Sequence, residues 1–580
     1  MKKKPIYIII FAGFIFTLPI LFYGAPFHGD DAVTHAGWYV HFSQQFWSGD
    51  LYPRWLAGMN SGLGSPVFYY YPPVPYFLTS LLKPFFSTDS FGWYQLGVSA
   101  SLAMIFSGLF AYLWLKQLVN ERSALIASVL YMASPYHLAS DLYIRFSFAE
   151  YWAFVWLPLI LVFTHKIAHG SRLALAGFAI SYALLIMTHL PTTLIFSLIP
   201  LGYALVLKTD QRPKTLGKLL FSMVLGIGLS AIYLYPALLM QKYVFLDRMG
   251  IGYFSYENWL FFSNFSLWTE DKWVILLLLA DLLVIAICAF VISRSKTDDG
   301  SGKMRLFWLL AAIGSVFMTT ELSKPIWQLF YPLQRIQFPF RFSIILTLAV
   351  TTLTAFAKSN YREVHSPKHF VVKAIYFLLI ASWVPIYFWA AFTAFPLQGA
   401  DRETINHKLE QCRDAPEYRP RWNESMNKVD WEISKDIDNW DANLEREYND
   451  LLQRVKGNTD SVSTINIVEG TGLLDMISWK SREIILRVKA ESEMKIYVPQ
   501  FYFPNWTALI EGQRKELTVE PSQPDGLLSL TVPKGNYDIQ LILTKSTEEI
   551  TGQLISMISI LCLTFYAAAI GLAKIRRRKN

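Results

Sequence analysis

Two adjacent carboxylates, Asp30 and Asp31, lie near the start of the longest polar interruption in the first half of the chain, residues 28–73. A helix capped by Asp30 would place Asp31, His35 and Trp38 on one face. A carboxylate can take the proton from an attacking hydroxyl, and carboxylate oxygens are also ligands that Mg²⁺ and Mn²⁺ prefer. We therefore expect Asp30 and Asp31 to be the catalytic residues, with N-capping as the alternative role of Asp30.

Further ionisable side chains lie at the ends of apolar runs, where a charge is costly enough to need a reason. Guanidinium groups clamp phosphate oxygens, and a divalent cation held by carboxylates stabilises a departing phosphate. The expected metal ligands are Asp31, Asp141 and Glu150, and the expected donor-phosphate ligands are Arg145, Arg335 and Arg341. The expected substrate-binding residues are His35, Arg54, His189 and Tyr71. The alternative for charged residues in such places is solvation at the membrane interface by snorkelling.

Two other sets of residues are weaker candidates for chemistry: one has a zinc-like spacing and the other has the residue types of a hydrolase triad. The first lacks a third nitrogen or sulfur ligand, and the second lacks a nucleophile elbow around its serine. Their members are His28, Asp31 and His35 for the first set, and Ser147, His189 and Asp141 for the second.

The composition sets the class of protein. Hydrophobic residues make up 53% of the 580 residues, and a mean hydropathy of +0.30 is too high for a soluble chain of this size. We predict a polytopic α-helical membrane protein with about 12 spans, of which the first apolar run, residues 6–23, has a signal peptide as its alternative. The three cysteines exclude a disulfide framework. Without a Walker loop or a Rossmann fingerprint, no nucleotide or organic cofactor is expected, and Mg²⁺ or Mn²⁺ is the expected ion.

Lysine and arginine collect in alternate predicted loops, as they do on the cytoplasmic side of membrane proteins. This pattern predicts cytoplasmic N- and C-termini in a plasma or inner membrane. It places a large first loop, residues 24–91, and the segment 397–548 on the extracytoplasmic side. The net charge of +8 then reflects anchoring at the membrane, and no nucleic-acid partner is expected.

Three domains follow from these assignments. Residues 1–396 form a transmembrane domain of about 11 spans, and residues 549–580 form the last span and a basic tail. Between them, residues 397–548 are polar and acidic, with no run long enough to cross a membrane. Within this α+β domain, residues 401–456 predict a helical part, and residues 461–545 alternate in short runs typical of a small β-sandwich.

Several strings of residues resemble known membrane families. The strings GDDAVTHAGW, LYPRWLAGMNSGLGSPVFYYYPP, DLYIRFSFAE and RIQFPFRF resemble the 6-pyruvoyl-tetrahydropterin synthase-related membrane family. FYFPNWTALIEG followed by TVPKGNYDIQLIL is similar to the C-terminal domain of YfhO-type membrane proteins. The overall plan looks like the GT-C superfamily of membrane glycosyltransferases, which use polyprenyl-phosphate sugars. The resemblance implies an acid in the first loop, Asp30 or Asp31, as the catalytic base, and Asp141 or Glu150 as a second acid at the metal.

The sequence thus predicts a membrane glycosyltransferase that moves a sugar from a polyprenyl-phosphate donor to an acceptor on the extracytoplasmic face. The expected partners are that donor, membrane lipids, and a glycan, lipid or protein acceptor. A lipid or glycan transporter is the leading alternative, in which arginines clamp a phosphate and no bond is broken. A non-catalytic membrane scaffold is the third.

Overall fold

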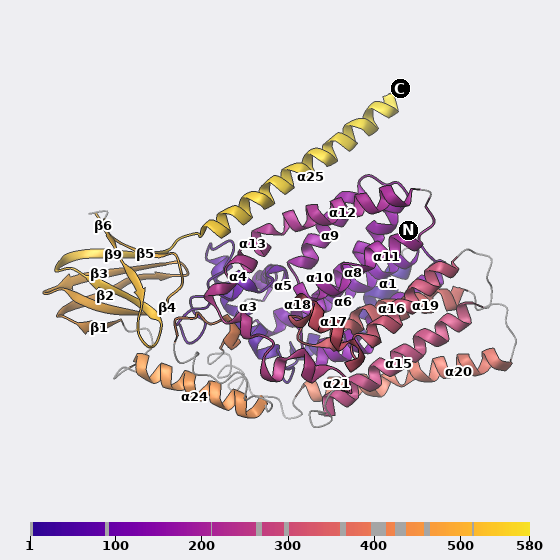
Figure 1. Ribbon diagram of the computed structural model, residues 1–580, viewed down its shortest axis with the longest axis horizontal. Helices are drawn as coiled ribbons and strands as arrows, with labels where there is room; N and C mark the ends of the chain where they lie inside the picture. The colour runs from indigo at the N-terminus through magenta and orange to yellow at the C-terminus, as the bar shows by residue number, and fades with distance from the viewer. Residues whose placement is uncertain are drawn as a thin grey trace.

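The fold consists of a large helical part and a smaller β region that lie end to end, with the long C-terminal helix running back from their junction (Figure 1). The structure is a computed structural model of the chain. It describes residues 4–86, 92–209, 211–262, 270–294, 301–359, 367–395, 413–423, 437–456, 465–512 and 515–579.

Five apolar stretches of helix are long enough to cross a membrane, and a bent pair of helices would make a sixth. The five are Trp93–Leu115 (α6), Phe148–Ala168 (α8), Pro339–Lys358 (η8, Pro339–Phe342, with most of α19, Ser343–Ser359), Phe370–Ala394 (in α20, Pro367–Ala381, and α21, Trp383–Ala394) and Thr547–Leu572 (in α25, Thr547–Lys579). The bent pair is Arg212–Leu229 (α12) and Ala231–Leu239 (α13), which meet at 73°. The predicted count of about 12 spans is therefore not confirmed.

Breaks in the helices account for part of the lower count, and several other apolar helices are shorter than 18 residues. The first apolar run is divided at Thr17 into α1 (Lys4–Phe16) and α2 (Leu18–Tyr23). A proline also stands in the first turn of two further short helices, α10 (Leu190–Phe196) and α11 (Ile199–Val206). Proline cannot continue a hydrogen-bonded helix from the preceding turn, so an apolar run that composition marks as one span becomes two short pieces. The other α- and π-helices of the helical part are α7 (Glu121–Met132), the π-helix η2 (Tyr136–Ile144), α9 (Ala174–Ile186), α14 (Tyr256–Trp259), α15 (Glu270–Ser293), α16 (Gly302–Phe317), α17 (Lys324–Leu329) and α18 (Tyr331–Gln334), apart from those of the first polar stretch.

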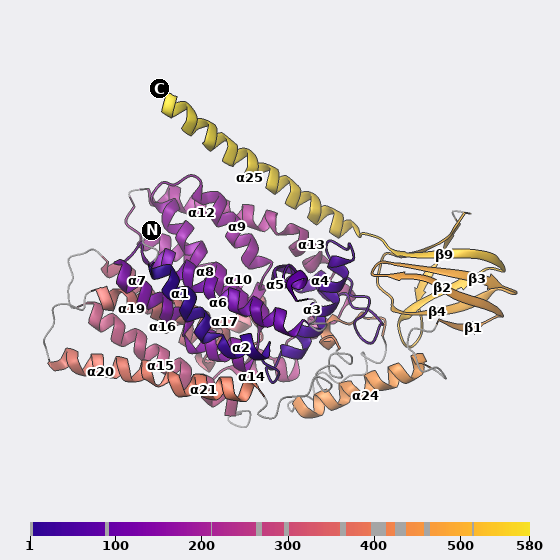
Figure 2. The same ribbon diagram turned by 180° about the vertical axis from the view of Figure 1, so that it is seen from behind.

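Small residues let neighbouring helices approach closely. A Cβ on Gly226 of α12 would lie 2.9 Å from the Ala179 carbonyl oxygen of α9, and one on Gly552 of α25 would lie 2.5 Å from the Ala231 carbonyl oxygen of α13. Close backbone packing of this kind is how helices associate where lipid removes the hydrophobic drive. It holds α25 against the bundle along α12 and α13, as Figure 2 also shows from behind.

The first polar stretch folds into α3 (Ala32–Trp47), α4 (Val67–Tyr70) and α5 (Val74–Ser80). Asp31, and not Asp30, occupies the N-cap position of α3, and its side chain makes no capping hydrogen bond. The predicted cap at Asp30 is therefore wrong by one residue. The Asp31 carboxylate accepts a hydrogen bond from the Ser147 hydroxyl (3.2 Å).

The β region contains two antiparallel sheets. One has the order β1 (Asn466–Glu469), β4 (Met494–Phe501), β8 (Leu527–Val532) and β7 (Val519–Pro521). The other has the order β2 (Gly472–Lys480), β3 (Glu483–Ala490), β9 (Gly535–Leu543), β5 (Trp506–Ile510) and β6 (Lys515–Leu517). Alternate residues of β3, such as Ile484, Leu486 and Val488, are fully buried, as the alternating sequence predicts. Of the predicted helical part 401–456, helix α24 (Ile437–Lys456) is described, while residues 401–412 and 424–436 lie outside the described residues.

A buried ionic cluster joins the β region to the rest. Glu549 of α25 forms ion pairs with Arg54 (3.2 Å) of the first polar stretch and with Arg482 (3.1 Å), which lies between β2 and β3. The Tyr69 hydroxyl also donates a hydrogen bond to Glu549 (3.2 Å). Because Arg54 and Glu549 are both 1% exposed, this cluster fixes three separate parts of the chain at one point.

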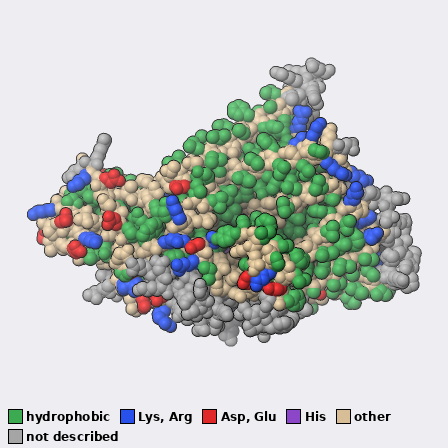
Figure 3. Space-filling model, in the orientation of Figure 1, with side chains coloured by type: hydrophobic (Ala, Val, Ile, Leu, Met, Phe, Trp, Pro, Cys, Tyr) green, Lys and Arg blue, Asp and Glu red, His purple; other side chains and the backbone are tan. Residues whose placement is uncertain are grey.

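The surface is divided in the same way as the fold. In Figure 3, hydrophobic side chains cover most of the visible helical part, including the side of α25. Lysine and arginine gather at the end of the helical part away from the β region, whereas acidic and basic side chains are mixed on the β region. This separation is typical of a membrane-embedded body with a polar domain at one end.

Candidate functional site

A cavity of about 880 Å³ lies where the first polar stretch, the helical bundle and residues 413–419 meet. Its charged and polar lining includes Asp30, Asp31, His35, Tyr71, Arg145, Arg248, Arg341, Asp414 and Glu417. Its apolar lining includes Met249, Ile251, Trp259, Ile275, Leu278 and Trp389, of which Ile275 and Leu278 lie on α15 and Trp389 on α21. One cavity therefore joins ionisable groups to the apolar helices of the bundle.

Four buried ionisable residues, Asp141, Arg145, Glu150 and Arg341, form a cluster whose two arginines line the cavity. Glu150, in the first turn of α8, accepts hydrogen bonds from Arg341 Nε (3.0 Å) and Arg145 Nη1 (3.4 Å), as well as from the Tyr136 hydroxyl (2.7 Å). Arg145 also pairs with Asp141 (3.1 Å). The i, i+4 spacing at the end of η2 brings this last pair together.

Two aromatic rings shield the guanidinium groups. The Phe338 ring lies 5.6 Å from Arg145 and 5.0 Å from Arg341, and the Phe340 ring lies 5.2 Å from Arg145. Cations over ring faces gain electrostatic stabilisation without a counter-charge. The two arginines thus stay charged in a largely dehydrated place while they line the cavity.

The balance of charge in this cluster favours an anion. Burial and the nearby Glu150 carboxylate raise the pKa of Asp141 well above its usual value, which favours the neutral form of Asp141. Its Oδ2 is buried and accepts no hydrogen bond within the described part of the chain. When Asp141 is neutral, two guanidinium groups face one carboxylate, and the cluster then carries one net positive charge next to the cavity.

The backbone joins the first acids to this cluster. The Asp31 amide donates to the Arg145 carbonyl (2.9 Å), and the Asp30 amide donates to the Ile144 carbonyl (3.2 Å). Asp31 is half-buried and Asp30 is exposed. A turn at Phe146, with φ of 49°, ends η2 and brings the backbone back so that α8 can begin at Phe148.

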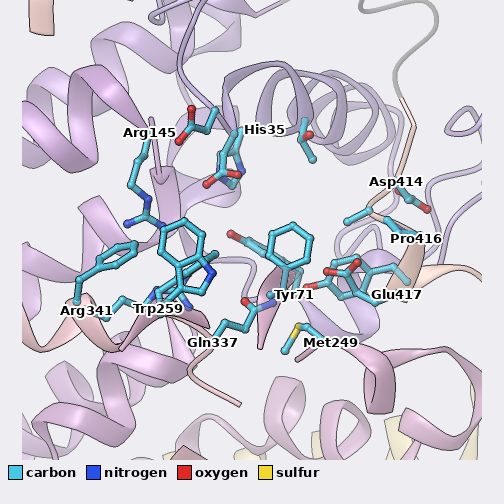
Figure 4. A pocket seen from close by; sticks show the side chains of 18 of the residues that line it. His35, Tyr71, Arg145, Met249, Trp259, Gln337, Arg341, Asp414, Pro416 and Glu417 are labelled. Atoms are coloured by element: carbon cyan, nitrogen blue, oxygen red, sulfur yellow. The ribbon is translucent and has the colours of Figure 1, made fainter. Parts of the chain in front are cut away.

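Further along α3, aromatic and imidazole rings form the middle of the cavity. His35 Nδ1 lies 2.6 Å from the Tyr76 hydroxyl, and burial lowers the pKa of His35 to about 4, so the ring is neutral. Tyr71 packs against Trp38 with ring centroids 4.7 Å apart. Figure 4 shows Tyr71 and His35 between Arg145 and Arg341 on one side and Asp414, Pro416 and Glu417 on the other.

Residues 413–419 were not predicted to be part of the site. Asp414 accepts hydrogen bonds from Trp38 Nε1 (3.2 Å) and Asn60 Nδ2 (2.8 Å), which hold this segment over α3. Burial, reinforced by Asp414 and Asp31 and opposed by Arg419, raises the pKa of Glu417 to about 7. The segment lies in the predicted polar domain, and no local signal in its sequence indicates contact with the first loop.

Five predicted residues lie outside the lining of the cavity: Asp141 and Glu150 sit behind it, bonded to the lining arginines, and Arg54, Arg335 and His189 lie elsewhere. Arg54 belongs to the ionic cluster at Glu549, where it also donates to the Ile232 carbonyl (2.7 Å). Arg335 donates to the Leu246 carbonyl, and His189 caps α10 by accepting from the Thr192 amide (3.4 Å). Arg54, Arg335 and His189 thus bind other parts of the protein, although Arg54 Nη1 is buried and has no hydrogen-bond partner in the described part of the chain. The structure thus brings together Asp30, Asp31, His35, Tyr71, Asp141, Arg145, Glu150 and Arg341 and leaves these three apart.

The described residues contain no group of three or more His, Cys, Asp or Glu side chains placed to hold a metal ion. Asp141 and Glu150 are instead engaged by the two arginines, and Asp31 faces Ser147. The predicted ligand set Asp31, Asp141 and Glu150 therefore does not fit a Mg²⁺ or Mn²⁺ site as it stands. The zinc-like and triad-like sets do not assemble either, because His35 is bonded to Tyr76 and His189 to Thr192.

Comparison with known proteins identifies one matching family, described as the 6-pyruvoyl-tetrahydropterin synthase related domain of a membrane protein. It matches residues 68–393, more than half of the chain. No curated protein matches the chain.

The solved structures that match this chain include those of three proteins. Arabinofuranosyltransferase AftD from Mycobacteria is 14% identical, with a TM-score of 0.44 over 68% of this chain and 27% of its own. The Archaeoglobus fulgidus oligosaccharyltransferase, solved with a tethered acceptor peptide, is 12% identical, with a TM-score of 0.44 over 73% and 60%. ArnT from Cupriavidus metallidurans, solved with undecaprenyl phosphate, is 11% identical, with a TM-score of 0.30 over 62% and 78%. The oligosaccharyltransferase has also been solved with Zn and sulfate.

Proposed function

For this chain, which belongs to the 6-pyruvoyl-tetrahydropterin synthase-related family of membrane proteins, we propose the function of a membrane glycosyltransferase. The donor is a sugar linked to a polyprenyl phosphate, and the acceptor carries a hydroxyl group. The observation that supports the proposal is one cavity that combines a half-buried carboxylate, Asp31, with a net-positive pair of arginines and an apolar wall.

Each part of the cavity corresponds to one part of such a donor. Arg145 and Arg341 face the phosphate, and the apolar side chains of α15 and α21 accommodate the first isoprene units. A lipid donor can reach these helices sideways from the bilayer, so its charged head and its chain enter the cavity together.

The reaction needs a base and a stabilised leaving group. The acceptor oxygen attacks the anomeric carbon of the sugar as Asp31 takes the proton of the acceptor hydroxyl. The bond between the anomeric carbon and the phosphate oxygen breaks, and the polyprenyl phosphate leaves with the bonding electrons. Arg145 and Arg341 then stabilise the charge on the departing phosphate. Asp30 is exposed beside the base, so we assign the proton transfer to Asp31.

The proposed orientation follows the charge pattern. Lysine and arginine at the far end of the helical part support cytoplasmic termini, and the cavity and the β region then lie on the extracytoplasmic side (Figure 3). The β region contacts the first polar stretch through Gln500, which accepts from Trp55 Nε1 (2.8 Å) and donates to the Ala57 carbonyl (3.1 Å). This contact supports a role for the β region in holding the extracytoplasmic loop in place.

A lipid-phosphate transporter is the second candidate, because the same arginines and apolar wall would bind the donor without cleaving it. The two functions are separated by measuring sugar release from radiolabelled polyprenyl-phosphate hexoses with purified protein in nanodiscs, supplied with an acceptor pool from the source membranes. The enzyme releases and transfers the label. Stoichiometric binding of donor that is never cleaved, and that is lost in Arg145→Ala, would favour transport.

A further inference from the structure

Residues 413–419 close the cavity on the side opposite the arginines, and this part of the cavity has no role yet in binding the donor. Figure 4 shows Asp414, Pro416 and Glu417 across the cavity from Arg145 and Arg341. What occupies this side must lie next to the sugar and away from the phosphate.

The direction of α3 places the acceptor there. Asp31 begins α3 beside the Arg145 carbonyl, and Trp38 lies two turns further along the same face, about 10 Å away at 1.5 Å per residue. Trp38 Nε1 donates a hydrogen bond to Asp414 (3.2 Å). Residues 413–419 therefore lie farther from the two arginines than Asp31, the proposed base, does. Since an attacking hydroxyl approaches the anomeric carbon from the side opposite the leaving phosphate, the acceptor extends toward Trp38 and Glu417.

The side chains at this end suit a polyhydroxylated ligand. Tyr71 and Tyr418 line it with ring centroids 6.2 Å apart, and Trp38 lies 4.7 Å from Tyr71. Within the described part of the chain, no other side chain hydrogen-bonds to the Glu417 carboxylate or to the Tyr71 hydroxyl, and both residues line the cavity. A carboxylate that accepts hydrogen bonds from hydroxyl groups, beside aromatic faces that cover C–H groups, is the combination that a sugar ring requires.

Few aliphatic side chains surround Glu417, and Met249 is the long one that lies beside it (Figure 4). Ile275 and Leu278 lie on α15, whereas residues 413–419 offer only Ala415 and Pro416 as aliphatic groups. A lipid acceptor would leave its chains against charged residues, which is unfavourable. We infer that the acceptor of the proposed transfer is a carbohydrate, held between Glu417 and the Tyr71–Tyr418 wall. This inference rests on the proposed glycosyltransferase function.

The test supplies the same radiolabelled donors with three separate acceptor fractions from the source cell envelope. These are a lipid-free, protease-treated oligosaccharide pool, a lipid extract and a delipidated protein fraction. With wild-type protein we expect the label in the oligosaccharide pool. Label that enters lipid or protein instead would overturn the inference and leave the proposed function standing, whereas no release of sugar with any fraction would overturn both.

Variants of Glu417 test the assigned contact. Glu417→Ala removes a charged hydrogen-bonding group and should raise KM for the oligosaccharide pool about 10- to 100-fold, while KM for the donor changes less than about 2-fold. Glu417→Gln preserves the size of the side chain and serves as the substitute if Glu417→Ala does not fold. It should also raise KM for the oligosaccharide pool while KM for the donor stays nearly unchanged. Glu520→Gln, at the exposed central residue of β7, is the matched control and should leave both constants unchanged. An equal rise in both KM values, or none, would overturn the assignment of Glu417 to the acceptor.

Discussion

Replacing Glu150 by Gln tests the charge assignment on which phosphate binding depends. Glu150 is 1% exposed and lies 3.0 Å from Arg341 Nε and 3.4 Å from Arg145 Nη1. At an effective dielectric constant of about 20, Coulomb's law gives about 5 kcal/mol for each pair. Much of this is offset by the cost of desolvating the charges, and removing one member of a buried pair typically costs about 3–5 kcal/mol. For a chain of this size we therefore expect Glu150→Gln to lower Tm by roughly 2–4 °C.

Asp141→Asn is the matched comparison, because Asp141 lies in the same cluster and its raised pKa favours the neutral carboxyl group. An asparagine keeps the oxygen that accepts from Arg145 (3.1 Å) and changes no charge. We expect Asp141→Asn to lower the free energy of unfolding by less than about 1 kcal/mol. Thermal unfolding of the two variants in the same detergent measures the difference. If Asp141→Asn destabilised the protein as much as Glu150→Gln, Asp141 would be ionised and the net positive charge of the cluster would be refuted.

Two further predictions concern pH and the β region. The Glu417 carboxyl has a pKa of about 7, and its ionised form accepts hydrogen bonds from the hydroxyl groups of the acceptor. KM for the acceptor should therefore fall as pH rises through 7. A pH-independent KM of the wild-type protein would contradict this prediction. Glu417→Gln should remove that dependence. Glu549→Gln leaves the buried Arg54 guanidinium without its carboxylate and should lower Tm by several degrees, whereas a Tm equal to that of Glu520→Gln would show that the cluster does not secure the β region.

The β strands were predictable because their burial follows the pleat. The run REIILRVKA forms β3, in which Ile484, Leu486 and Val488 point inward while Arg487 pairs on the surface with Asp538 at 3.0 Å. Alternation of this kind depends only on neighbouring residues. The number of spans cannot be read from neighbouring residues in this way. It depends on whether a proline or a single hydroxyl side chain interrupts an apolar run.

Part of the site could also be predicted from the sequence. Helical spacing predicted that Asp31, His35 and Trp38 share a face, and all three line the cavity. Arg145 and Arg341 were predicted as site residues because a charged side chain at the end of an apolar run needs a partner. The same reasoning failed for Arg54, because an arginine in a buried structural ion pair carries the same sequence signal as one that faces a ligand.

The opposite wall of the cavity could not be found from local sequence. Trp38 and Asp414 are 376 positions apart, and their hydrogen bond forms only when the segment after the bundle folds back over α3. Long-range pairings of this kind leave no periodic pattern in a single sequence. Glu417 lies beside Pro416 in a short 3₁₀ turn, Pro416–Tyr418, which has no helical or strand periodicity.

The most direct test of the proposed transfer compares Asp31→Asn with Asp30→Asn in the nanodisc assay. The amide oxygen introduced by Asp31→Asn would still accept from the Ser147 hydroxyl, so the change removes the base while preserving the contact. We predict that Asp31→Asn lowers sugar transfer about 10²-fold or more at unchanged donor binding, and that the change at the exposed neighbour, Asp30→Asn, has a much smaller effect. Undiminished transfer by Asp31→Asn would contradict the assignment of the base, and donor binding without release of sugar by the wild type would contradict the enzyme itself.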